Sequence, residues 1–121
     1  MAHKLFLTTA VLLTISIAIG SLITVTNVVQ VKISNSDKII HLIAYLVLAI
    51  NWLIALKQLL NNNKKIILVG LAVIFYGIII EALQGLLTTH RQADFIDVLA
   101  NSIGVFIAVI MFKKIFFQKL S

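Results

Sequence analysis

The chain has 121 residues and a net charge of +6, is 61% hydrophobic and 12% charged, and contains neither proline nor cysteine. A soluble domain of this length cannot bury so much apolar surface in its own core, so the composition indicates a single-domain integral membrane protein. The missing cysteines exclude disulfides and thiol chemistry. Nucleic-acid binding is not expected, because the lysines flank apolar runs and form no basic stripe with aromatic residues.

Four apolar segments follow one another along the chain: Leu5–Thr26, Ile39–Leu60, Ile66–Leu87 and Phe95–Phe117. Each is long enough to cross a hydrocarbon core of about 30 Å as an α-helix. The polar breaks between them are short, which forces successive helices to run antiparallel. The predicted fold is therefore all-α, a membrane bundle of four antiparallel transmembrane helices that forms one domain over residues 1–121.

The first segment could also be a signal peptide, because His3 and Lys4 precede its apolar run. The run is longer than a typical signal core, and no small-x-small cleavage site follows Gly20 and Ser21. We therefore expect an uncleaved first helix.

The lysines predict the orientation in the membrane. Seven lie at the N-terminus, around the second loop and at the C-terminus: Lys4, Lys57, Lys64, Lys65, Lys113, Lys114 and Lys119. Three basic residues lie on the opposite side: Lys32, Lys38 and Arg91. Because positively charged flanks stay in the cytoplasm, both termini are expected to be cytoplasmic.

Polar residues recur at helical spacing near the predicted outer ends of three segments. Counting from Lys65, Glu81 lies about 24 Å along the third helix, inside the outer leaflet, where a charge must face the bundle and find partners. The stripes are Asp37, His41 and Tyr45; Gly77, Glu81, Gln84 and Thr88; and Asp94, Asp97, Asn101, Gly104 and Ala108. Antiparallel order places all three stripes at one end of the bundle.

Several of these residues have a structural interpretation beside the functional one. Asp37 and Asp94 are placed to cap helix N-termini. His41 fits a general base, a metal ligand or a hydrogen-bonding residue, but without a second histidine at ligand spacing we expect no metal and no other cofactor. Glu81 is either one half of a structural pair with Arg91 or His41 or part of a functional site.

Four residues are open to packing roles. Tyr45 suits packing with a satisfied hydroxyl, and Asn51 suits an interhelical hydrogen bond. Gly104 and Ala108 have the small-xxx-small spacing that lets a neighbouring helix approach closely.

The polar residues also form a recognisable series of motifs. The run Asp37-Lys38-x-x-His41-x-x-x-Tyr45 is followed by Glu81-x-x-Gln84, by Arg91, and by Asp94-x-x-Asp97-x-x-x-Asn101-x-x-Gly104. In order and spacing these blocks, from Asp37 to Gly104, resemble the VanZ-like family. The resemblance implies a bacterial inner (plasma) membrane protein. The family's founder is associated with low-level resistance to teicoplanin, but the family name supplies no reaction.

The candidate polar site comprises Asp37, His41, Tyr45, Glu81, Gln84, Arg91, Asp94, Asp97 and Asn101. The first hypothesis is an outward-facing site that binds a cell-envelope lipid, such as a polyprenyl phosphate or a lipid-linked wall precursor, with Arg91 facing the phosphate. Such binding would alter glycopeptide sensitivity. One alternative is an intramembrane enzyme acting on a lipid headgroup, with His41 or Glu81 as acid–base groups and Asp97 as orienter or metal ligand. The others are a proton- or ion-coupled transporter element and a structural or assembly subunit.

Overall fold

A computed structural model describes residues 2–23, 34–87 and 95–116 of the chain. Within these residues it contains four long α-helices: α1 (Ala2–Ile23), α2 (Ser34–Ala55), α3 (Asn63–Leu87) and α4 (Phe95–Phe116). Each of them is long and apolar enough to span a bilayer. A short 3-10 helix, η2 (Lys57–Leu59), follows α2. The predicted multi-pass, all-α membrane fold is confirmed.

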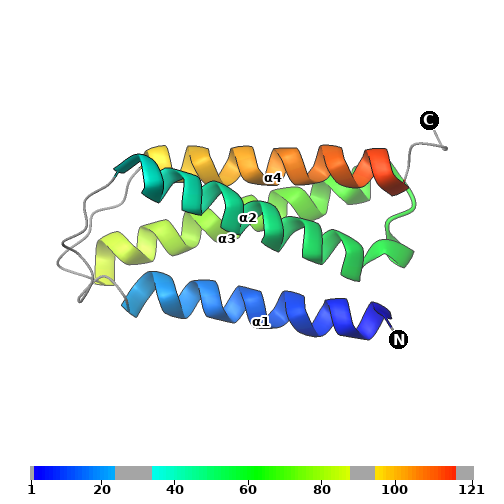
Figure 1. The fold of residues 1–121 in the computed structure, drawn as a ribbon, viewed down its shortest axis with the longest axis horizontal. Helices are drawn as coiled ribbons and strands as arrows, with labels where there is room; N and C mark the ends of the chain where they lie inside the picture. Colours follow the sequence, from blue (N-terminus) through cyan, green and yellow to red (C-terminus); the bar gives the residue numbers. More distant parts are fainter. Residues whose placement is uncertain (1, 24–33, 88–94, 117–121) are drawn as a thin grey trace.

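The helices run antiparallel in chain order, as predicted (Figure 1). The start of α1, the η2 turn and the end of α4 lie at one end of the bundle, and the starts of α2 and α4 lie at the other. The most extensive contact joins α2 and α4. Large apolar side chains cover the outside, for example Leu5, Phe75 and Phe106, which are all more than 60% exposed. Such a surface is stable only against lipid.

Three helices begin earlier than the hydropathy pattern predicts, and the first of them, α1, begins at Ala2 instead of Leu5. Helix α2 begins at Ser34 instead of Ile39, so its first turn includes polar residues that we expected to lie in a loop. Helix α3 begins at Asn63 instead of Ile66. The cause at α3 is an N-cap, because the Asn62 side-chain oxygen accepts a 2.9 Å hydrogen bond from the backbone N–H of Lys65. Hydropathy marks the hydrocarbon span, whereas the cap decides where the helix begins.

The close approach of α2 and α4 depends on small residues of α4. Gly104 is buried, and a Cβ atom there would overlap the backbone carbonyl oxygen of Leu42 and lie 3.1 Å from the backbone nitrogen of Leu46. Ala108, one turn further along, is fully buried. The small-xxx-small prediction for these two residues is confirmed.

Polar side chains attach α1 to the other helices. The Thr9 hydroxyl donates to the Asn51 side-chain oxygen (2.9 Å), and the Trp52 indole N–H donates to the Thr14 hydroxyl (3.0 Å). The Tyr76 hydroxyl donates to the backbone carbonyl of Thr14. The expected interhelical hydrogen bond of Asn51 is confirmed. Because lipid offers no competing hydrogen-bond partners, such bonds can hold a helix whose surface is largely exposed to lipid.

Candidate functional site

Three ionisable side chains from three helices meet inside the bundle. His41 of α2, Glu81 of α3 and Asp97 of α4 each offer a ligand-type atom, and these atoms all lie within 4.8 Å of one another. The Glu81 residue is 4% exposed and Asp97 is 0% exposed. Carboxylates buried at membrane depth are costly unless they have partners, so their convergence is the main chemical feature of the described structure.

Lys38 supplies a positive charge to this cluster. Its Nζ atom donates a 2.5 Å hydrogen bond to Asp97 Oδ1 and forms an ion pair with that carboxylate. The His41 Nε2 atom lies 3.9 Å from the other oxygen, Asp97 Oδ2. The Lys38 side chain is 27% exposed, so its ammonium lies at the edge of the bundle while the carboxylate is fully buried. Asp97 is therefore held between a cation and an imidazole.

A second layer lies one helical turn deeper on the same three helices. It consists of Tyr45, Gly77 and Asn101, each four residues from His41, Glu81 or Asp97 along its helix. A Cβ atom on Gly77 would lie 3.0 Å from the Tyr45 ring and 3.1 Å from Asn101 Nδ2, so the glycine admits both side chains. The Asn101 Oδ1 atom is buried and accepts no hydrogen bond from any described residue.

The remaining predicted site residues divide into two groups. Gln84 is buried one turn beyond Glu81, and its Nε2 atom donates a 2.7 Å hydrogen bond to the backbone carbonyl of Ser21, which ties α3 to α1 near the cluster. Arg91 and Asp94 lie outside the described residues. Of Asp37 only the backbone is described, in the first turn of α2. Because that helix begins at Ser34, Asp37 does not precede it as an N-cap.

The structure adds Lys38 to the predicted site. In the sequence Lys38 is a membrane-flanking charge and part of the first motif, but it is not among the candidate site residues. Its distance of three residues from His41 was the available signal, because residues at i and i+3 share one face of a helix. The partner could not be read from that spacing, since it depends on which face α4 turns toward α2.

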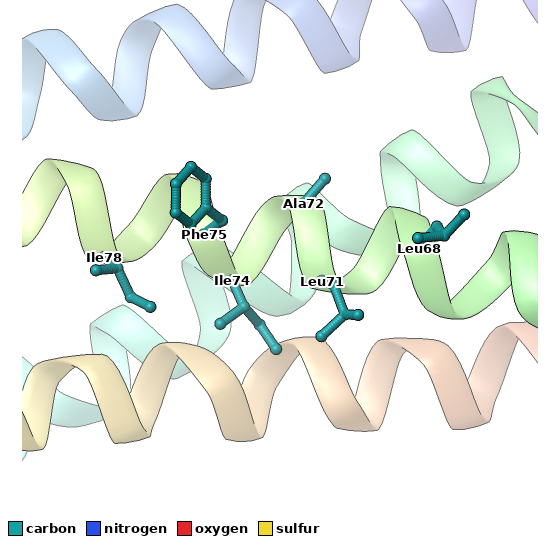
Figure 2. Close-up of a pocket in the computed structure, with 6 residues that line it drawn as sticks. All are labelled: Leu68, Leu71, Ala72, Ile74, Phe75 and Ile78. Carbon is teal, nitrogen blue, oxygen red and sulfur yellow. The ribbon is translucent and has the colours of Figure 1, made fainter.

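A shallow apolar depression lies on α3, and its lining ends one turn before Glu81. It is lined by Leu68, Leu71, Ala72, Ile74, Phe75 and Ile78 (Figure 2). Every one of these lining side chains is apolar. Ile74 and Ile78 precede Glu81 by seven and three residues, which places them beside the Glu81 face of the helix. Most of the lining side chains are exposed, whereas Glu81 is buried, so the depression lies on the outer surface of α3 within one helical turn of Glu81.

Comparisons with protein families, with characterised proteins and with solved structures found no match for this chain.

The chemistry available to the cluster follows from its groups. Glu81 and Asp97 can accept hydrogen bonds or bind cations, the His41 imidazole can donate and accept hydrogen bonds, and Lys38 can pair with an anion. Their position between the helices of the bundle excludes much of the bulk water. Electrostatic interactions there are therefore stronger than on a water-exposed protein surface. The arrangement suits recognition of a charged headgroup at the end of an apolar chain.

Proposed function

We propose that this protein binds the phosphorylated headgroup of a cell-envelope lipid, such as a polyprenyl phosphate or a lipid-linked wall precursor, at the Lys38–His41–Glu81–Asp97 cluster. The observation that carries the proposal is the meeting of these side chains within a helix bundle that is otherwise apolar. Lys38 and His41 would donate to the phosphate. The depression on α3 would receive the first part of the lipid chain, because its lining is apolar and ends one helical turn before Glu81.

The proposal includes membership of the VanZ-like family and a place in the bacterial inner membrane, with both termini in the cytoplasm. It is supported by the motif residues His41, Glu81 and Asp97, which lie together, and by the excess of lysines at the end of the bundle opposite the cluster. A site at the outer face would contact wall precursors where glycopeptides bind them. Expression of the protein is therefore expected to change the sensitivity of cells to teicoplanin.

The orientation can be tested with single cysteines, because the chain has none of its own. Asn61→Cys places a thiol in the connection between α2 and α3, and Ala93→Cys places one between α3 and α4. A membrane-impermeant maleimide added to intact spheroplasts is expected to label Ala93→Cys, and Asn61→Cys only after lysis. The reverse labelling pattern would place the cluster on the cytoplasmic side and remove the outer-leaflet part of the proposal.

Lipid binding can be tested with purified protein in nanodiscs, using a polyprenyl phosphate and the uncharged polyprenol of the same length as probes. The phosphate form is expected to bind at least about tenfold more tightly, because one charge-assisted hydrogen bond contributes about 1.5–3 kcal/mol. The paired replacement Lys38→Met with Asp97→Leu removes both charges without stranding either one, and it is expected to abolish this preference.

Lys64→Met is the matched control, because it removes an exposed lysine at the other end of the bundle. It is expected to leave the preference for the phosphate unchanged. Equal binding of phosphate and alcohol by the unaltered protein would refute headgroup recognition. Equal effects of Lys64→Met and of the paired replacement would show that net charge, and not the cluster, attracts the lipid.

The second candidate function is an intramembrane enzyme that acts on such a headgroup. The specific observation in its favour is the position of His41 Nε2, 3.9 Å from Asp97 Oδ2, since a carboxylate beside an imidazole is a common arrangement in general acid–base catalysis. The same nanodiscs distinguish the two functions. Release of a labelled phosphate or headgroup, lost with His41→Ala, would identify an enzyme, whereas binding without turnover would favour the first function.

A further inference from the structure

The composition of the cluster raises a problem of charge for an anionic lipid. With Glu81 and Asp97 ionised and Lys38 protonated, two negative charges and one positive charge leave the described cluster at −1. A phosphate entering this site would be repelled by the two carboxylates. One more positive group close to both carboxylates would reverse the sign of the site.

We propose that His41, Glu81 and Asp97 bind one divalent transition-metal ion. They supply one nitrogen and two oxygen donors from three different helices, and these donor atoms already lie within 4.8 Å of one another. Metal–ligand bonds to imidazole and carboxylate are about 2.0–2.2 Å, so donors around a tetrahedral ion lie about 3.4 Å apart. The gap between His41 Nε2 and Asp97 Oδ2 is 3.9 Å, which small side-chain rotations can close.

The donor types restrict the choice of ion. An imidazole nitrogen with two carboxylates favours Zn²⁺, Mn²⁺ or Fe²⁺ over Mg²⁺ and Ca²⁺, which prefer oxygen donors alone. Three protein ligands leave at least one coordination position for a ligand that is not part of the protein. Catalytic zinc sites have this arrangement, whereas structural zinc sites have four protein ligands. A phosphate oxygen or a water molecule can occupy that position. With the ion bound, the charge of the cluster changes from −1 to +1.

Neighbouring groups fit the outer shell of such a site. Lys38 pairs with Oδ1 of Asp97, which leaves Oδ2 on the side of His41 for the ion. Carboxylate ligands of metals are commonly held by such an outer hydrogen bond. Asn101, one turn deeper than Asp97 and 3% exposed, has a buried side-chain oxygen that accepts no hydrogen bond from the described residues. A buried acceptor of this kind is expected to accept a hydrogen bond from a water molecule or to contact an ion.

The charge argument for the ion rests on the proposed lipid function, but the donor geometry does not, so the metal site is tested without lipid. Purified protein is treated with a chelator, dialysed, and titrated with ZnCl₂, MnCl₂ and MgCl₂. We expect one equivalent of Zn²⁺ or Mn²⁺ per chain and no comparable binding of Mg²⁺. His41→Ala is expected to weaken binding by at least about 100-fold, since loss of even an outer-shell group costs about 10–100-fold. His3→Ala is the matched control, because it removes a histidine from the first turn of α1, and it is expected to bind metal as the unaltered protein does.

A spectroscopic measurement covers the case in which His41→Ala does not fold. X-ray absorption of the zinc-loaded, otherwise unaltered protein is expected to show one imidazole among oxygen ligands. No stoichiometric binding by the unaltered protein, binding that persists in His41→Ala, or a spectrum without imidazole would overturn the proposal. If the unaltered protein bound no metal but still preferred polyprenyl phosphate, the metal site would be disproved and the proposed lipid function would stand.

Discussion

Replacing Gly104 with alanine is expected to destabilise the bundle by about 3 kcal/mol, at the upper end of the usual cost of overpacking. The added methyl would overlap the carbonyl oxygen of Leu42, which is backbone and cannot rotate away. Helices α2 and α4 must then separate along their largest contact. Thermal unfolding of the purified protein in detergent, followed by size-exclusion chromatography, measures the loss. Gly104→Leu is expected to give no folded protein.

Gly20→Ala is the control for this prediction. A Cβ atom on Gly20 would have no atom within 4 Å other than those of its own stretch of helix, so the same chemical change adds no clash there. Its unfolding temperature is expected to equal or exceed that of the unaltered protein, because alanine is a better helix former than glycine. If Gly104→Ala unfolded at the same temperature as Gly20→Ala, the close contact of α2 with α4 would be wrong. The position of His41 relative to Asp97 would then be wrong as well.

The second large effect is expected at the Lys38–Asp97 pair. Lys38→Met leaves a fully buried carboxylate without its cation and is expected to cost about 3–5 kcal/mol. Asp97→Leu is expected to cost less, because the partly exposed lysine can extend toward the membrane surface. The paired replacement with both changes is expected to restore most of the stability, since apolar residues can take the place of a buried ion pair.

A double-mutant cycle measures this coupling by unfolding of all four proteins under one condition. A strongly positive coupling together with loss of phosphate-lipid preference in the paired variant is the expected outcome. If the losses in unfolding free energy of the two single replacements were additive, the ion pair would contribute nothing to stability. Lys38 would then be only a membrane-flanking charge. If the paired variant kept the lipid preference, the headgroup would bind elsewhere.

Much of the candidate site was predicted from spacing alone. The four-residue intervals of His41 with Tyr45 and of Asp97 with Asn101 indicated one face on each helix, and antiparallel order placed those faces at one end of the bundle. Lys38 was missed as a site residue. The pairing of Asp97 with it depends on the rotation of α4 about its axis, and periodicity does not specify rotation closely enough to choose between neighbouring partners.

The membrane fold was readable in the sequence because the length and apolarity of a span are properties of consecutive residues, and hydrocarbon requires each span to satisfy its own backbone hydrogen bonds. The contacts within the site were decided only by tertiary structure. Gly104 lets α4 approach the backbone of Leu42, and this approach brings the Asp97 face of α4 to the Lys38 and His41 face of α2. Van der Waals packing between helices that are far apart in the sequence sets this arrangement of side chains. Lipid provides no hydrophobic force that would distinguish one apolar helix face from another.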